Sequence, residues 1–412
     1  MQKIIKKPEL LAPAGDIEKL AVACRYGADA VYLGGQQYSL RAGAKNFDNA
    51  QMAECVTYAH DHGKKVYVAT NIFAHNRDFD DMPSFLKMLE ELSVDGVIVS
   101  DAGVLHMVQR YAPGLNIHIS TQANTTNYYA AGFWHKMGAG RVILARELSL
   151  REIREVHDNT PGLEVEVFVH GAMCIAYSGR CLLSHTLTGR CANMGACAQP
   201  CRWKYHLMEE TRPGEYMPVC EDKRGTYIYN AKDLCMIEHI PSLVDTGAVS
   251  FKIEGRMKSP YYVGTVVKAY RQAIDDYFDD PDLYKGRVAY YLEEIQKCSH
   301  RAYSTGFYFE DDKSTQQMDD ASAYIRTYDF VGMILKYDHS RGMALVEQRN
   351  KMQLGDEIEI LRAKGENIAL RLTVMCDEEG SPIESAPHPQ QRIWVCMPYV
   401  EHYDMLRRRV TT

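Results

Sequence analysis

The first half of the chain alternates short apolar runs with stretches whose hydrophobic residues recur at helical spacing. Eight apolar runs have the character of strands in a parallel sheet that is covered on both faces. These runs are Glu9–Ala12, Ala30–Leu33, Lys65–Ala69, Gly96–Ser100, Asn116–Ser120, Arg141–Ala145, Glu164–Val169 and Ser250–Ile253. Amphipathic stretches lie between them, for example Asp16–Tyr26 and Asp81–Leu92. Two more helical stretches follow the last strand, at Pro260–Asp279 and around Tyr290–Cys298.

Eight strands, most of them followed by a helix, predict a TIM-like (β/α)₈ barrel of the α/β class. A doubly wound sheet would alternate in the same way. The barrel is favoured by the strand count and because polar residues follow nearly every strand. In a barrel these residues meet at the C-terminal face, where such enzymes keep their active sites. They are Gly34 and Gly35, Thr70 and Asn71, Asp101, Thr121 and Gln122, Arg146 and Glu147, His170 and Gly171, and Glu254 to Arg256.

The pattern changes twice along the chain. The connection between the seventh and eighth strands, at about 171–247, is unusually long and rich in cysteine, and we expect it to fold over the mouth of the barrel. From about residue 329, alternating strands are separated by turns such as the one at Lys364 and Gly365. The sequence therefore predicts a barrel domain at 1–328, with this insertion, and a small β-barrel domain at 329–412.

Composition places the chain among ordinary cytoplasmic proteins. Of its 412 residues, 46% are hydrophobic and 25% are charged. No stretch approaches the roughly 20 apolar residues of a membrane span, and the basic N-terminus lacks the apolar run of a signal peptide. The net charge of −7 argues mildly against a surface coated with basic residues for nucleic acid, but it leaves room for a local basic patch.

The cysteines indicate a metal site. In the cytoplasm thiols stay reduced, so twelve cysteines point to metal binding or buried thiols rather than disulfides. Cys174, Cys181, Cys197 and Cys201 follow the spacing C-x6-C-x15-C-x3-C, which matches neither a zinc ribbon nor a ferredoxin. An all-thiolate set suits either zinc or an iron–sulfur cluster, and the residues alone leave both open. Buried structural thiols, or a nucleophilic cysteine, are the alternatives.

Several blocks resemble the signature of the peptidase U32 family, also called collagenase-like peptidases. The strongest block runs from Glu166 to Cys174, EVFVHGAMC, and continues in YSGRCLLS from Tyr177. Further matching blocks are ELLAPAG from Glu9, GADAVYLG from Gly27, STQ from Ser120, NAKDLC from Asn230, FKIEGR from Phe251 and RAYSTGF from Arg301. The resemblance covers the chain to about residue 310, and longer members of the family carry a small C-terminal domain as well.

The resemblance implies an activity other than the one in the family name. The most similar branch hydroxylates tRNA, making 5-hydroxyuridine at the wobble position without molecular oxygen and with prephenate. Another branch carries a 4Fe-4S cluster on four cysteines. Matched position by position, Cys174, Cys181 and Cys197 correspond to ligands, and Cys201 is the predicted fourth, with Cys220 and Cys235 as alternatives. A U32-type peptidase and a zinc-stapled RNA-binding or assembly factor remain the rival functions.

Polar residues at the strand ends supply the rest of the predicted site. Prephenate, a small dicarboxylate, needs cations, and Arg146 and Arg256 offer bidentate clamps. We assign catalytic roles to Gln122, Arg146, Glu254 and Arg256. We assign substrate contacts to Arg41, Asn71, His170 and Lys252. The alternative is that pairs such as Lys252 with Glu254 are structural ion pairs at the rim.

The expected macromolecular partner is tRNA, through its anticodon loop. A wobble base is single-stranded and can be splayed out and stacked on an aromatic ring. For the RNA backbone we note three basic groups: Arg202 with Lys204, Lys252 with Arg256 and Lys258, and the run Arg407–Arg409. The sequence predicts no membrane contact and gives no indication of the oligomeric state.

Overall fold

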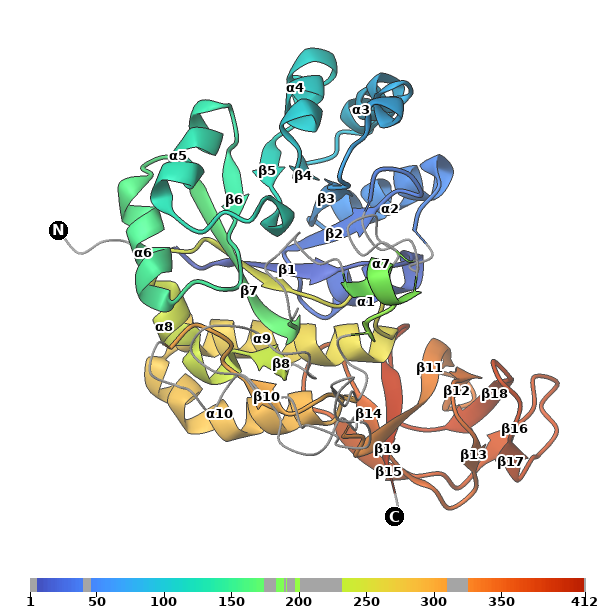
Figure 1. Ribbon diagram of the computed structural model, residues 1–412. Helices are drawn as coiled ribbons and strands as arrows, with labels where there is room; N and C mark the ends of the chain where they lie inside the picture. Colours follow the sequence, from blue (N-terminus) through green and yellow to red (C-terminus); the bar gives the residue numbers. More distant parts are fainter. Residues whose placement is uncertain are drawn as a thin grey trace, which may run out of the picture.

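The computed structural model describes residues 6–39, 46–173, 183–188, 190, 197–200, 232–309 and 325–410. Two bodies are visible (Figure 1): a barrel with its helices, coloured from blue to orange, and a β-rich domain in red. Each has its own hydrophobic core.

The first body is a closed barrel of eight parallel strands. Hydrogen bonding runs in order from β1 to β7, then to β9, which pairs with both β7 and β1 and so closes the ring. The strands are β1 Glu9–Pro13, β2 Ala30–Gly34, β3 Lys65–Thr70, β4 Gly96–Val99, β5 Ile117–Ile119, β6 Arg141–Ile143, β7 Glu164–Ala172 and β9 Ser250–Ile253. All eight predicted strands are present, and the predicted (β/α)₈ barrel is confirmed.

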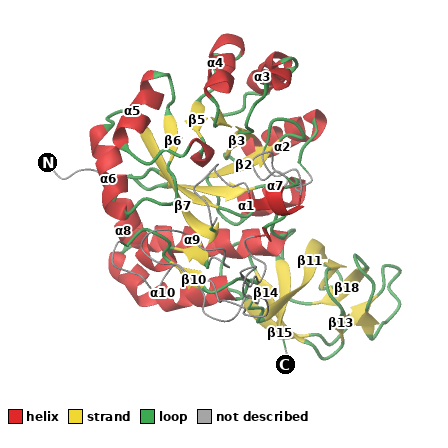
Figure 2. Cartoon of the chain, in the orientation of Figure 1, coloured by secondary structure: helices red, strands yellow, loops and turns green. Residues whose placement is uncertain are grey.

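Helices cover the outside of the barrel (Figure 2). They are α1 Ile17–Arg25, α2 Asn49–Asp61, α3 Met82–Glu91, α4 Ala102–Tyr111, α5 Tyr128–Lys136, α6 Leu150–Asn159, α8 Ile240–Asp245 and α9 Pro260–Asp279, with α10 Pro281–Gln296 packed on α9. Helix α10 begins nine residues before the predicted stretch, because Asp280 caps it and Pro281 occupies its first turn. Among the described residues, no helix has both the length and the apolar character needed to cross a bilayer.

Strand β7 is longer than its apolar run predicts. Its last residues, His170 to Ala172, pair antiparallel with a short strand that is not part of the barrel, β8 Asp233–Cys235. Strand β10 Tyr303–Ser304 pairs in turn with β8. Of the segment between β7 and β8, the structure describes mainly helix α7 Leu183–Thr188 and the adjoining residues 197–200. Most of the predicted insertion at 171–247 therefore lies outside the described residues.

The second body is an antiparallel sheet domain. Its main sheet has the order β15-β14-β19-β11-β12-β18-β16, and a two-stranded ribbon joins β13 and β17. The strands are β11 Tyr328–Asp338, β12 Met343–Gln348, β13 Met352–Gln353, β14 Glu357–Leu361, β15 Ile368–Arg371, β16 Met375–Cys376, β17 Ser385–Ala386, β18 Arg392–Cys396 and β19 Met405–Arg409. Within 325–410 the end strands β15 and β16 do not pair, so the main sheet is open. The boundary at 328/329 stays a prediction.

A buried ionic contact joins the two bodies. Arg407 on β19 is fully buried, and its guanidinium bonds Glu294 of α10 at 2.7 Å and Glu359 of β14 at 2.5 Å. Nearby, Lys268 of α9 donates to the backbone oxygen of Arg362 at 2.7 Å. The prediction that Arg407 contacts the RNA backbone is therefore wrong, since the side chain is turned into the interface between the domains.

Candidate active site at the mouth of the barrel

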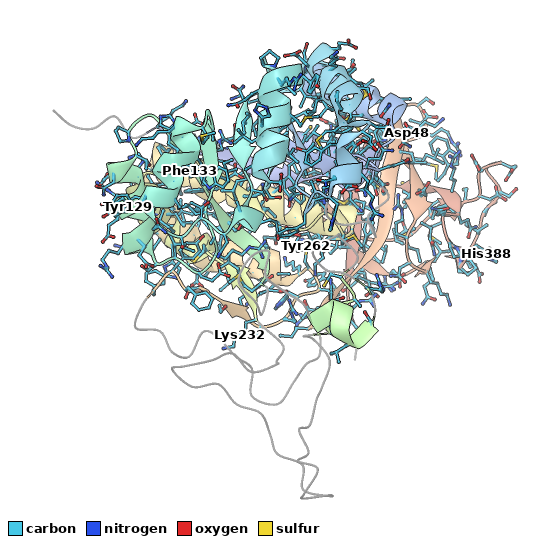
Figure 3. The ribbon with its side chains drawn as sticks, turned by 45° about the horizontal axis from the view of Figure 1, so that its top comes forward. Asp48, Tyr129, Phe133, Lys232, Tyr262 and His388 are labelled. Atoms are coloured by element: carbon cyan, nitrogen blue, oxygen red, sulfur yellow. The ribbon has the colours of Figure 1, made fainter. Side chains whose placement is uncertain are left out.

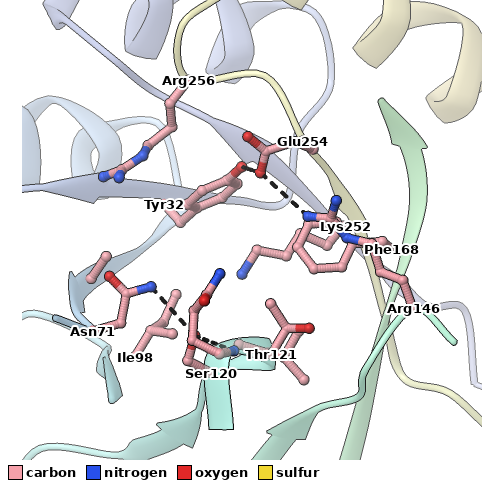
Figure 4. A pocket seen from close by; sticks show the side chains of 13 residues that line it. Tyr32, Asn71, Ile98, Ser120, Thr121, Arg146, Phe168, Lys252, Glu254 and Arg256 are labelled. Carbon is pink, nitrogen blue, oxygen red and sulfur yellow. Dashed lines mark hydrogen bonds and ion pairs between the residues drawn. The ribbon is translucent and has the colours of Figure 1, made fainter. Parts of the chain in front are cut away.

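A pocket opens at the carboxyl ends of the barrel strands (Figure 4). Its empty volume is about 470 Å³, including open solvent at the mouth. The lining residues are Tyr32, Ala69, Asn71, Ile98, Ser120, Thr121, Gln122, Ile143, Arg146, Phe168, Lys252, Glu254 and Arg256. All four residues assigned catalytic roles line this pocket, together with Asn71 and Lys252.

The alternation of side chains along a strand explains the lining. Residues two apart point to the same side of a strand. Tyr32 on β2, Phe168 on β7 and Lys252 on β9 therefore point into the barrel, one layer below the polar residues that follow the strands. The sequence analysis overlooked Tyr32, Ser120 and Phe168. Each lies two residues before one of the polar residues noted after the strands, Gly34, Gln122 and His170, so a count of two back from those residues would have found them.

Arg146 follows β6 and crosses one side of the pocket. Its Nη1 donates to the backbone oxygen of Ala172 at 2.6 Å, and its Nη2 lies 3.8 Å from the carboxylate of Glu254. The guanidinium carbon sits 3.9 Å from the centre of the Phe168 ring, a cation–π contact. Its Nε is buried and has no hydrogen-bond partner among the described residues. A buried donor without a partner is costly, so this atom is suited to receive a ligand oxygen.

Arg256 follows β9, two residues after Glu254, and both line the pocket. The side chain is buried, and its Nη1 donates to Ser39 Oγ at 2.9 Å. Gly34 makes room for it, because a Cβ at that position would lie 2.2 Å from Arg256 Nη1. A side chain at position 34 would therefore displace the Arg256 guanidinium or Ser39.

Lys252 lies on the floor of the pocket and pairs downward, into the barrel. Its Nζ is 2.9 Å from a carboxylate oxygen of Glu166, which is fully buried and also accepts from Arg141 at 3.1 Å. Arg141 in turn donates to Glu9 at 2.6 Å. Charged residues therefore fill a layer that in most such barrels is apolar. The rim alternative, in which Lys252 pairs with Glu254, is wrong, because the partner is Glu166 one layer below.

Glu254 and Tyr32 form a second polar pair in the pocket. The Tyr32 hydroxyl is 3.3 Å from a carboxylate oxygen of Glu254 and 3.0 Å from the backbone oxygen of Ile253. Across the pocket, the Asn71 amide donates to Ser120 Oγ at 3.3 Å. Carboxylate and hydroxyl at this distance can exchange a proton with a bound molecule.

His170 was assigned to the substrate site, and the structure places it elsewhere. A bulge in β7 between Phe168 and His170 shifts the register, so that His170 lies opposite Ile253 instead of following Lys252 and Glu254 into the pocket. The ring is 1% exposed and packs against Tyr262, which Figure 3 labels, and against Tyr270 and Tyr303. Burial lowers its pKa to about 3 and keeps it neutral. The assignment of a direct substrate contact is therefore corrected.

The predicted cluster ligands fall largely outside the described residues. This holds for Cys174, Cys181 and Cys201, for the alternative Cys220, and also for the predicted substrate residue Arg41. Cys197 is described: it is partly exposed, and its Sγ accepts the backbone N–H of Gln199 at 3.3 Å.

N–H groups donate in the same way to thiolates that hold iron–sulfur clusters, so the Gln199 N–H is compatible with Cys197 as a ligand. The alternative ligand Cys235 is buried in β8 beside Tyr270, and burial raises its pKa to about 12. Within the described part of the chain, no three His, Cys, Asp or Glu side chains gather as a metal site.

Comparison with known protein families gives two matches. The profile of Peptidase family U32 matches residues 15–318. The profile of the Peptidase family U32 C-terminal domain matches residues 326–407. Together they cover both bodies of the structure.

Among curated proteins, the chain is similar to three that modify RNA. It is 44% identical to tRNA hydroxylation protein P1 of Bacillus subtilis over 388 residues, which is 94% of this chain and 91% of that protein. It is 37% identical to tRNA hydroxylation protein P of Escherichia coli, over 95% of this chain and 94% of that protein. A 23S rRNA 5-hydroxycytidine synthase of Escherichia coli is 36% identical over 73% of this chain and 45% of its own length.

Proposed function

The chain belongs to peptidase family U32, and from this membership and the pocket we propose that it is an enzyme that hydroxylates tRNA. The observation that carries the proposal is the identity of 44% over nearly the whole length of a tRNA hydroxylation protein. A further relative is named as a synthase of 5-hydroxycytidine in 23S rRNA, so hydroxylation of a second RNA also occurs among the relatives of this chain. The word peptidase is the name of the family and says nothing further about this chain.

In its finer form, the proposal is oxygen-independent 5-hydroxylation of the wobble uridine with prephenate, in the cytoplasm. The charges of the pocket support an anionic small molecule. Three cationic side chains, Arg146, Lys252 and Arg256, line it together with one carboxylate, Glu254. Guanidinium groups bind carboxylates through paired hydrogen bonds. The proposal places one small acid in the pocket and lets the tRNA approach from the open mouth.

A 4Fe-4S cluster is the proposed cofactor, held by Cys174, Cys181, Cys197 and Cys201. When bound it would supply electrons for a reaction that does not use molecular oxygen. Zinc is the alternative occupant. The support from this chain is the all-cysteine set and the N–H that Gln199 donates to Cys197 at 3.3 Å.

The pocket residues have separate tasks in this proposal. Arg146 and Arg256 hold the carboxylates of the acid, and the unpartnered Nε of Arg146 contributes a donor. Glu254 and the Tyr32 hydroxyl, 3.3 Å apart, take up or return a proton beside the bound acid. The Phe168 ring, which the Arg146 guanidinium covers at 3.9 Å, closes one side of the site to water. Orientation and exclusion of water are thus tasks of this chain's own side chains.

The proposed function is tested by nucleoside analysis of tRNA. In a strain that lacks this gene and any close relative, 5-hydroxyuridine and nucleosides derived from it are expected to disappear, and the wild-type gene is expected to restore them. Unchanged nucleosides in the deletion strain would refute the function. The purified protein is expected to leave gelatin intact, and gelatin cleavage would support the rival peptidase.

The ligand set makes a second prediction. After anaerobic purification we expect about four iron and four sulfide per chain, because a 4Fe-4S cluster needs four thiolates. Replacement of Cys197 with serine is expected to lower the iron content by at least half, as is replacement of Cys201. Cys235→Ser, in the core of β8, serves as the control and is expected to keep its iron. Loss of iron in Cys235→Ser with full iron in Cys201→Ser would exchange the two assignments, and stoichiometric zinc without iron would refute the cluster.

A further inference from the structure

Lys252 is the one lysine among the residues that line the described pocket, and its amino group points toward the middle of it (Figure 4). The side chain is 5% exposed. Its Nζ lies 4.4 Å from the centre of the Tyr32 ring and 5.6 Å from that of Phe168. The amine therefore lies between two aromatic rings on the floor of the pocket, where it also bonds Glu166.

The surroundings of Lys252 favour an amine that can lose its proton. Burial lowers the pKa of Lys252, and the attraction of Glu166 offsets this only in part. The carboxylate of Glu166, 2.9 Å from Nζ, holds the amino group in place on the floor of the pocket. A lysine that is kept away from water and has a lowered pKa is the form that attacks carbonyl carbon.

The other charged side chains of the pocket indicate which kind of carbonyl compound Lys252 would meet. Arg146 and Arg256 suit a carboxylate, and Glu254 with Tyr32 suits a group that gains or loses a proton. A carboxylate held by the guanidinium groups, with a ketone on the neighbouring carbon, would bring that ketone toward the floor of the pocket. Acids of this type are 2-oxo acids, and prephenate contains such a group.

We propose that Lys252 forms an imine with the ketone of a 2-oxo acid bound in this pocket. The ammonium releases one proton to water at the mouth of the pocket, and the amine lone pair forms the C–N bond. Water returns that proton to the oxygen, a second nitrogen proton follows, and the C–O bond breaks to release water. The sum is R–NH₃⁺ + O=CR₂ → R–NH⁺=CR₂ + H₂O, which is balanced and needs no oxidant. The iminium fixes the acid and withdraws electrons from its neighbouring carbons.

Reductive trapping tests the imine. The full-length protein is incubated with pyruvate or phenylpyruvate and sodium cyanoborohydride, and its intact mass is measured. We expect one adduct per chain, with a mass increase equal to the acid minus one oxygen atom, and peptide mapping is expected to place it on Lys252. Lactate, which has the carboxylate without the ketone, is expected to give no adduct.

Two lysine variants serve as controls for the trapping. Lys252→Arg keeps the positive charge beside Glu166 and is expected to abolish the adduct, whereas Lys65→Arg, whose side chain is 58% exposed, is expected to retain it. Circular dichroism checks that both variants fold. An adduct spread over surface lysines, or none on Lys252 of the wild type, overturns the proposal, and peptide mapping of the wild type decides even if Lys252→Arg does not fold.

The imine rests on the proposed function only through the choice of acid, and the two can fail separately. Trapping needs neither tRNA nor a cluster. A protein that hydroxylates tRNA without forming the adduct refutes the imine alone. A protein that forms the adduct while the deletion strain keeps its 5-hydroxyuridine refutes the hydroxylation alone.

Discussion

Replacement of Glu166 with glutamine is expected to lower the free energy of unfolding by about 3–5 kcal/mol, because removal of one partner from a buried ion pair leaves an uncompensated charge. Glu166 is fully buried and serves two cations, Lys252 at 2.9 Å and Arg141 at 3.1 Å. A neutral amide would leave both cations short of negative charge in the middle of the barrel. Urea denaturation followed by circular dichroism measures the loss.

Glu164 provides a matched control on the same strand. It also bonds Arg141, at 2.7 Å, but its side chain is 50% exposed. Water screens such a pair, so Glu164→Gln is expected to cost about 0–1 kcal/mol. Equal losses in the two variants would contradict the assignment of Glu166 as the central counterion of the barrel.

The contacts of Glu166 with Lys252 and Arg141 also predict how acid affects the stability of the protein. Burial alone would raise the pKa of Glu166, but Lys252 and Arg141 outweigh it and lower the pKa from 4.5 to about 2. A carboxyl whose pKa is lower in the folded state contributes stability above pH 4.5 and loses it as the pH falls toward 2. The wild type is therefore expected to lose more stability than Glu166→Gln over this range.

Replacement of Arg146 with lysine is expected to reduce tRNA hydroxylation by about a hundredfold or more, since loss of a buried, hydrogen-bonded charge contact costs about 2–5 kcal/mol. Lysine keeps the charge but cannot bond Ala172, approach Glu254 and stack on Phe168 at once. The unpartnered Nε would also be lost. The measurement is the 5-hydroxyuridine content of tRNA in a deletion strain that carries the variant gene.

Arg151 offers the control for this substitution. It lies on α6, five residues further along the chain, and its side chain is 68% exposed. Arg151→Lys is expected to restore 5-hydroxyuridine as well as the wild type does. If Arg146→Lys also restores it fully, the guanidinium is not needed and the assigned role of Arg146 is wrong.

The barrel could be predicted from the sequence because its signals are local. Each barrel strand is a short apolar run, and the polar residues that follow it need only the strand direction to be placed at the mouth. Asn71, Gln122, Arg146, Glu254 and Arg256 were found in this way, and all five line the pocket. The family signature then supplied what periodicity cannot, namely a function.

Side-chain partners could not be predicted in the same way, because they depend on the register of strands far apart in the sequence. Lys252 pairs with Glu166, 86 residues away, and not with Glu254, its near neighbour. His170 leaves the pocket because one extra residue in β7 turns the strand. A bulge of this kind has no clear signature in a run of apolar residues.

The sequence by itself determined the barrel with its second domain, the end of the barrel where the polar residues collect, and the cysteine set proposed to hold a cluster. Only the tertiary structure decided which charges neutralise one another inside the barrel, that Arg407 joins two domains, and that Lys252 lies on the pocket floor beside Tyr32. The physical reason is the distance along the chain between the residues that interact. Periodicity reports which face of an element is buried, whereas the cost of a buried charge is set by the partner that the fold brings to it.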